Sequence, residues 1–264
     1  AYGEFELPYN DPLLPDQWHY INNVDLSVAQ TSREGADINV KEAWKLCAGD
    51  PEIIVAVCDE GVKYTHPDLI DNMWVNAGEI PDNDIDDDGN GYVDDIHGYN
   101  FVNKGRITWT RSGDSGHGTH VAGTVAAVNN NGIGVAGVAG GSGNGNGVRI
   151  MSIQIFDGPD NSTVKQNARG IEYAADNGAC ILQNSWGYPN SQLTDSDYEQ
   201  GMSFECDALR YFAKQSGCSA MKGNVVIFAA GNYANASADY PGAYNEFIAV
   251  TAYAPDGLPT SYTN

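Results

Sequence analysis

Residues 52–61 read EIIVAVCDEG, an apolar run that ends in two acids and a glycine. A short apolar run bounded by turn residues is typical of a strand buried on both faces of a parallel sheet. Four further runs have this character, at 148–156, 180–186, 224–230 and 246–253. Helical patterns lie between them, at 120–128, at 163–178 and within 197–216. Strands that alternate with helices predict an α/β domain whose mostly parallel central sheet is flanked by helices.

Length and charge narrow the class of protein. A chain of 264 residues that is 42% apolar can bury a large core, and no repeat or linker divides it, so we expect a single domain over 1–264. Its 35 acidic and 13 basic residues give a net charge of -22, which argues against nucleic acid as a partner. No apolar run reaches the length of a membrane span, and we expect a signal peptide to be absent or already removed.

Residues that suit an active site follow three of the predicted strands. Asp59 follows the first run, Ser185 and Trp186 close the run at 180–186, and Asn232 lies just beyond 224–230. Ligands of such sheets bind beyond the carboxyl ends of the strands. Each residue alone is more often a simple turn residue, so the prediction depends on their occurring together.

The segment GDSGHGTHVAG (113–123) admits three interpretations from its residues. GDSG is the string around the nucleophilic serine of one protease family. His117 and His120 are three apart, which is compatible with a metal-binding pair. HGTHVAG is typical of a helix start that carries a catalytic histidine, and Ala122 and Ala126 would pack that helix rigidly.

Four segments together resemble the subtilisin-like serine peptidases. VAVCDEGVKYTHPDL (55–69) resembles the segment with the triad aspartate, and GHGTHVAGTVAA (116–127) the segment with the triad histidine. NSWG (184–187) resembles the substrate-binding strand edge, and FAAGN (228–232) the segment with the oxyanion asparagine. The resemblance implies the three-layer fold of that family, with its C-terminal part missing from this chain.

The resemblance assigns a role to each matching residue. Asp59 would orient the imidazole, His117 would act as general base and then as general acid, and Asn232 would donate its amide to the oxyanion. His120, one helical turn on, is expected to be packed and hydrogen-bonded in the core. A peptide substrate would lie along the strand edges, with a mild preference for apolar side chains before the scissile bond. The residues implied for substrate binding are Ser185, Trp186, Gly187, Ala230 and Gly231.

The chain departs from the family pattern at three points. Glu60 follows the aspartate, where Ser or Thr is usual, and Tyr233 follows the asparagine, where an acid or a small residue is common. No GTSMA-like segment, which carries the nucleophile in this family, occurs in the chain. We therefore expect the serine to come from a C-terminal fragment or a second chain, and this chain alone to be inactive; a propeptide is a further possible partner.

An acidic segment predicts a calcium site inserted at about 82–95. Seven of its fourteen residues are Asp and none is Lys or Arg. DIDDDGNGYVDD (84–95) matches the pattern D-x-D-x-D-G with an acid at position twelve, and Gly89 would supply the sharp turn. An acidic solvated loop is the alternative, but so many like charges on a tight turn would repel one another without a cation. The expected ligands are Asp84, Asp86, Asp88, Asn90 and Asp95.

A second calcium site follows from the resemblance alone. The family often ties its N-terminal segment through calcium to the loop after the histidine helix, and YNDP, HPDL and VNNNGIGV (128–135) match those pieces. All of its donors are hard oxygens. The implied ligands are Asp11, Asp68, the Asn131 side chain and the carbonyls of Val128, Ile133 and Val135. Calcium fits an extracellular, periplasmic or cell-surface location.

Three functions remain as hypotheses from the sequence. The first is a calcium-stabilised endopeptidase with an Asp-His-Ser triad. The second is a non-catalytic calcium-binding scaffold that keeps the same fold. The third is a metallohydrolase that uses His117 and His120, and it ranks last because the chain has no HExxH string and no clear third ligand.

Overall fold

The apolar run around residue 55 forms the centre of a parallel sheet. The computed structural model describes residues 7–27, 29–189 and 193–264. Strand β1 (Ile54–Glu60) pairs with β3 (Arg149–Asp157) on one side and with β5 (Ile181–Asn184) on the other. The sheet order is β2-β3-β1-β5-β6-β7, and short β4 pairs with β3 as an antiparallel strand. The remaining strands are β2 (Gly98–Asn100), β4 (Asp160–Asn161), β6 (Val225–Ala229) and β7 (Ile248–Val250).

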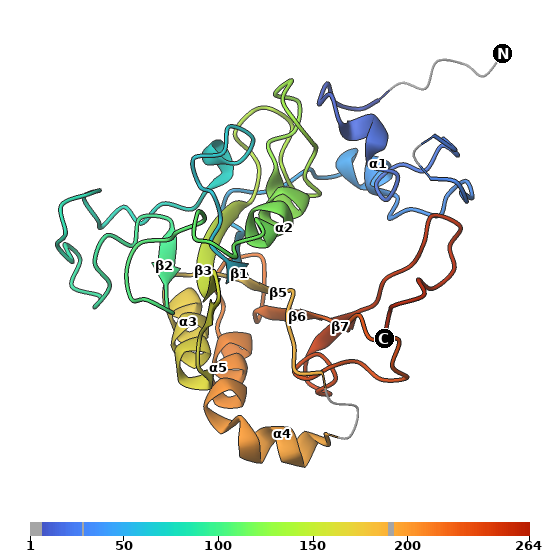
Figure 1. The fold of residues 1–264 in the computed structure, drawn as a ribbon. Coiled ribbons are helices and arrows are strands. Elements are labelled where there is room, and N and C mark those ends of the chain that lie inside the picture. Colours follow the sequence, from blue (N-terminus) through green and yellow to red (C-terminus); the bar gives the residue numbers. More distant parts are fainter. Residues whose placement is uncertain (1–6, 28, 190–192) are drawn as a thin grey trace.

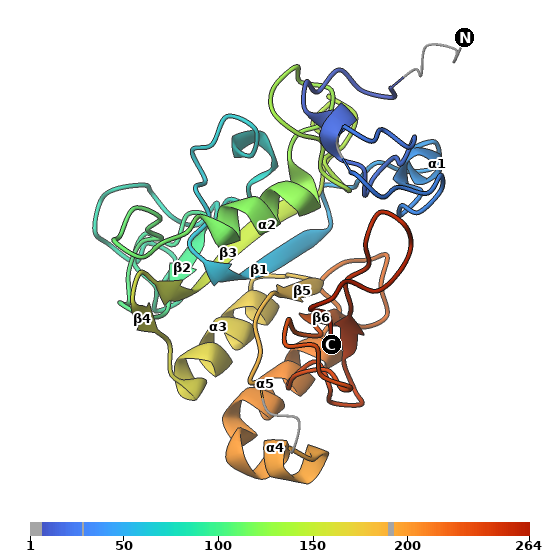
Figure 2. The ribbon, with the colours of Figure 1, turned by 45° about the vertical axis from the view of Figure 1, so that its right-hand side comes forward.

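Helices cover both faces of this sheet, which confirms the predicted α/β architecture (Figure 1). Helix α2 (His117–Ala126) packs on the face to which Val55 and Val57 point. Helices α3 (Val164–Asp176) and α5 (Ser203–Lys214) pack on the face of Ala56 and Cys58. Successive residues of a strand point to opposite faces, so a strand buried on both sides must be apolar throughout. Figure 2 shows α2 alone on its side and α3 and α5 together on the other.

The helices begin and end where local interactions allow. Helix α3 starts at a capping box in which the side chains of Thr163 and Gln166 each accept a backbone N–H, as the sequence pattern favours. Helix α2 begins at His117, three residues before its predicted start. The helix predicted within 197–216 is two helices, α4 (Asp195–Gly201) and α5.

The N-terminal segment packs beside the loop that follows α2 (Figure 1). It contains two short helices, η1 (Leu14–Asp16) and α1 (Val40–Trp44), while η2 (Ile70–Asn72) follows β1. The Gln17 side chain donates to the carbonyl of Ala136, and the Trp44 indole donates to the carbonyl of Val138. Residues more than 90 positions apart are thereby joined.

The last strand differs from its prediction. The run at 246–253 was expected to be buried, but β7 covers only Ile248–Val250 and its residues are exposed, with Ile248 at 51% and Val250 at 55%. β7 pairs only with β6 and ends the sheet order, so no described strand covers its outer edge. Within the described residues, no helix is both long enough and apolar enough to cross a membrane.

Two glycines of α2 offer a matched test of how closely the helix lies on β1. A Cβ at Gly118 would overlap the carbonyl oxygen of Glu60, whereas a Cβ at Gly123 would meet no atom within 4 Å. We expect Gly118→Ala to destabilise the fold by about 1–3 kcal/mol, because α2 must move off the strand. Gly123→Ala should stabilise it by about 0.5–1 kcal/mol through helix propensity. Urea unfolding of both variants checks this, and equal effects would contradict the close approach.

Candidate functional site

A buried acid and a half-exposed histidine form the centre of the site. Asp59 lies near the carboxyl end of β1 and is buried, while His117 is the first residue of α2. Asp59 Oδ1 and His117 Nδ1 are 2.7 Å apart, and Oδ1 also accepts the backbone N–H of Glu60 at 2.7 Å. A proton on Nδ1 leaves the lone pair on Nε2, which makes no hydrogen bond with any described residue. The pair therefore holds an imidazole with its basic nitrogen free.

Glu60, the departure noted in the sequence, holds the start of α2. Its carboxylate accepts the backbone N–H of Ser115 at 3.1 Å and of His117 at 3.0 Å, and the Ser115 hydroxyl at 2.9 Å. The N-cap residue Gly116 has no side chain to do this. A carboxylate at the N-terminus of a helix satisfies free N–H groups and complements the helix dipole. Glu60 thus fixes the position of the histidine next to Asp59.

The electrostatics of the site favour the charged imidazole. The hydrogen bond to Asp59 raises the pKa of His117 above its ordinary value of 6.5. The negative charges of Asp59 and Glu60 raise this pKa further, while partial burial lowers it. Asp59 Oδ2 is buried and has no hydrogen-bond partner among the described residues. Such a site stabilises an imidazolium that forms when the base takes a proton.

The two strand ends predicted to bind substrate lie side by side. β5 and β6 are parallel neighbours, so Ser185–Gly187 and Ala230–Asn232 continue from the same edge of the sheet as Asp59. The Asn232 side chain is exposed and makes no hydrogen bond within the described residues. Trp186 turns inward instead, with its ring 5.3 Å from that of Phe228. Its packing explains the choice of a large aromatic residue at that position.

The prediction that His120 is packed in the core is wrong, because its side chain is exposed. The buried face of α2 is formed by Gly118, Ala122 and Ala126, and His120 lies on the opposite face, in a groove of about 560 Å³.

Two of the three interpretations of residues 113–123 find no support. In the described part of the chain, no metal-binding cluster joins His117 and His120. The Ser115 hydroxyl donates to Glu60, so it is not directed at the imidazole.

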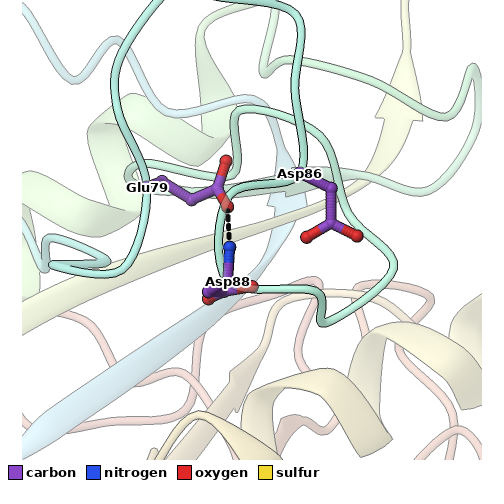
Figure 3. Close-up of side chains that lie close together, drawn as sticks. All are labelled: Glu79, Asp86 and Asp88. Atoms are coloured by element: carbon purple, nitrogen blue, oxygen red, sulfur yellow. Dashed lines mark hydrogen bonds between the residues drawn. The ribbon is translucent and has the colours of Figure 1, made fainter.

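The acidic loop gathers three carboxylates, one of which the sequence pattern missed. Glu79, Asp86 and Asp88 have carboxylate oxygens within 4.8 Å of one another (Figure 3). Asp86 accepts the backbone N–H groups of Asn90 and Gly91, at 3.0 and 2.8 Å. These two hydrogen bonds close a tight turn. The carboxylate oxygens of the cluster are ligands of the kind that calcium prefers. Glu79 lies outside the motif, so only the folded loop brings it to the cluster.

The cluster of three carboxylates does not include Asp84, the first residue of the predicted calcium loop. Asp84 was expected as its first ligand, but its carboxylate pairs with Arg106 at 2.9 Å, which draws it out of the cluster. A second string of this kind, D-x-D-x-N-G, starts two residues later at Asp86, with Gly91 at the sixth position and a φ of 95°. This second string could have been recognised from the sequence alone.

Asp95 lies buried at the inner side of this loop. The hydroxyl of Tyr173 donates to its carboxylate at 2.6 Å. The side-chain amides of Asn76 and Asn90 each donate to both Asp88 and Asp95, over 2.9 to 3.1 Å. Asp95 and Asn90 therefore adjoin the cluster.

The acids predicted for the second calcium site lie beside the 128–135 loop. Asp11 and Asp68 are both buried, and each accepts backbone N–H groups from the 128–135 loop. The Asn131 amide donates to Asp68 at 2.8 Å. Burial raises the pKa of Asp11, and the neighbouring charge of Asp68 adds to this. No described Lys or Arg forms an ion pair with either acid. The carbonyls of Val128, Ile133 and Val135 belong to the same loop.

Comparisons of the sequence and of the structure with known proteins both find proteases. The model of the subtilase family, peptidase S8, matches residues 50–264. Thermitase of Thermoactinomyces vulgaris is 31% identical over 215 residues, which are 81% of this chain and 60% of thermitase. Subtilisin-like protease 1 of Plasmodium berghei is 39% identical over 131 residues, 49% of this chain and 19% of that protein. A solved protease of Pseudoalteromonas arctica superposes with a TM-score of 0.63 at 25% identity, covering 98% of this chain and 69% of that one. The chain thus spans less than two thirds of these two curated relatives.

Titration of His117 tests the proposed electrostatics without relying on activity. Asp59→Asn should lower the pKa of His117 markedly, and Glu60→Gln should lower it by less, because each removes a charge that favours the imidazolium. Glu34→Gln, an exposed acid outside the site, is the matched control and should leave it unchanged. NMR of the imidazole Cε1–H against pH measures all three. An unchanged pKa in Glu60→Gln would show that Glu60 acts only on the helix backbone.

Proposed function

Because this chain belongs to the subtilase family, we propose that it carries the acid–base and oxyanion-binding parts of a serine endopeptidase. The observation that supports this most directly is the 2.7 Å contact between buried Asp59 and the Nδ1 atom of His117. It leaves Nε2 as the only basic nitrogen of the ring, as a general base requires. The parallel strands β1, β5 and β6 end at one edge, where an extended peptide can lie across them.

The proposed reaction is acyl transfer in two steps. His117 Nε2 takes the proton of a serine hydroxyl while that oxygen attacks the scissile carbonyl, and Asp59 stabilises the imidazolium. The same proton then passes to the leaving amine as the C–N bond breaks, which leaves an acyl-enzyme. Water repeats the sequence: His117 takes one of its protons and returns it to the serine oxygen as the acid is released. Asn232 donates its side-chain amide to the oxyanion that forms in each step.

The substrate is proposed to bind as an added strand. Residues 185–187 and 230–231 would flank its backbone. Main-chain hydrogen bonds of this kind bind any extended peptide, so side-chain pockets must supply the selectivity. A peptide or protein substrate fits this arrangement.

The triad is proposed to be completed by a serine from outside this chain. His117 Nε2 has no described partner, no GTSMA-like string occurs in the sequence, and the relatives are longer than this chain. A C-terminal segment or a second chain would supply the serine. We also propose a propeptide as a partner, and a secreted, periplasmic or cell-surface location for the protein.

Calcium is proposed to bind at both acidic sites. Glu79, Asp86 and Asp88, with Asn90 and Asp95 adjoining, would hold one ion. Asp11, Asp68 and Asn131, with carbonyls of the 128–135 loop, would hold the other. Bound calcium supplies positive charge that offsets the repulsion between close carboxylates, and it takes no part in the reaction. The second ion would tie the N-terminal segment to the loop after α2.

A fluorophosphonate probe, which labels an activated serine, tests the proposed enzyme. The protein is assayed together with the segment that supplies its serine. His117→Ala should lower kcat on the order of 10⁶-fold and abolish labelling, whereas Asn232→Ala should lower kcat by about 100- to 1000-fold. His120→Ala, an exposed histidine on the same helix, is the control and should retain activity. Absence of labelling in the unmodified protein would favour the non-catalytic scaffold.

Removal of calcium tests the proposed ion sites and the proposal that Asp88, rather than Asp84, binds the ion. EDTA should lower Tm, because an ion bound only to the folded state stabilises it by about 2.7 kcal/mol at a hundredfold excess over Kd. Asp88→Asn should reduce this calcium-dependent shift. Asp84→Asn should retain it, since Asp84 pairs with Arg106. Thermal unfolding with and without calcium measures both, and loss of the shift only in Asp84→Asn would show that Asp84 is the ligand.

A further inference from the structure

An acid that the proposed reaction does not use lies between the two substrate-binding strand ends. Asp239 is 4% exposed. Its backbone N–H donates to the carbonyl of Ala230 at 2.7 Å, and the carbonyl of the next residue, Tyr240, accepts the N–H of Tyr188 at 2.6 Å. Residues 239–240 therefore bridge the continuation of β6 to the continuation of β5.

The Asp239 carboxylate lies directly against the glycines of both strand ends. A Cβ built on Gly231 would overlap this carboxylate, and one built on Gly187 would lie 3.3 Å from the Cβ of Asp239. Gly231 has a φ of 114°, which only glycine adopts readily. The segments proposed to flank the substrate thus meet at one carboxylate.

This carboxylate has no cation to balance it. Its one side-chain partner is Asn264, whose Nδ2 donates to Oδ1 at 3.1 Å, and no described Lys or Arg forms an ion pair with it. Burial raises the pKa of Asp239. A buried carboxylate without a counter-charge is costly, and a ligand that brings a positive charge recovers part of that cost.

We propose that Asp239 is a specificity-determining residue that binds the cationic side chain, Lys or Arg, of the substrate residue just before the scissile bond. The proposal rests on the proposed function, because it takes residues 185–187 and 230–231 to flank that part of the substrate. It replaces the mild apolar preference expected from the sequence. Oδ2, the oxygen that faces Gly231, is the one left for the substrate cation, since Asn264 occupies Oδ1.

The net charge of -22 gives a competing reason for any preference for basic peptides. A long-range field attracts cations to the whole molecule, and salt screens it over about 8–10 Å. A contact with one buried carboxylate is confined to one substrate position and is screened much less. Substrate position and salt dependence therefore separate the two explanations.

Matched peptides test the proposal on the protease with the segment that supplies its serine. We compare substrates that differ only in the residue before the scissile bond: Arg, its uncharged isostere citrulline, and Phe. The unmodified protein should cleave the Arg peptide with a kcat/KM roughly 10- to 100-fold above that of the citrulline peptide, also at high salt. Asp239→Asn should abolish this ratio while cleavage of the Phe peptide is retained. Asp207→Asn, an exposed acid on α5, removes the same charge and should leave the ratio unchanged.

The possible failures are distinguishable. Cleavage of the Phe peptide without preference for Arg over citrulline overturns the role of Asp239 and leaves the proposed peptidase intact. If no peptide is cleaved, the proposed function fails, and fluorescence anisotropy with peptides ending in Arg or citrulline still tests the site. Tighter binding of the Arg peptide that is lost in Asp239→Asn supports the proposal, and equal binding of both peptides overturns it.

Discussion

The hydrogen bond between Asp59 and His117 joins the two elements on which the site is built. Asp59 is fixed because β1 lies in the middle of the sheet, and His117 is fixed because α2 begins where Glu60 binds its free N–H groups. The glycine at 118 allows the helix to approach the strand this closely. Strand, helix and acid–base pair therefore depend on one another, and a shift in any of them displaces the imidazole.

The strong negative charge of the chain is organised rather than spread evenly. Glu60 caps a helix, and Asp84 and Asp94 pair with Arg106. Other carboxylates are grouped without a basic partner among the described residues, as at Asp11 and Asp68. Buried like charges are costly unless a cation joins them, so these groups mark the sites proposed for ions and for a cationic substrate side chain.

Much of the fold could be predicted because local patterns express it. Strands buried on both faces must be apolar throughout, and the alternation of such runs with helices is visible in one dimension. Asp59 was singled out as the acid that follows a predicted strand, whereas His117 was singled out by the resemblance of its segment to a known family. The burial of the run at 246–253 was not predictable, because it depends on what covers a strand in space. His120 was misjudged because the buried face of α2 is set by its contact with the sheet.

The sequence by itself determined the order of strands and helices, the acid at the end of β1, the histidine at the start of α2 and the acidic composition of the loop at 82–95. These are properties of neighbouring residues. Only the tertiary structure decided which distant carboxylates meet: Glu79 with Asp86 and Asp88, Asp84 with Arg106, and Asp239 with the glycines at 187 and 231. Electrostatic interactions act through space over a few ångströms, so charges far apart in the chain come to act on one another only after the backbone has folded.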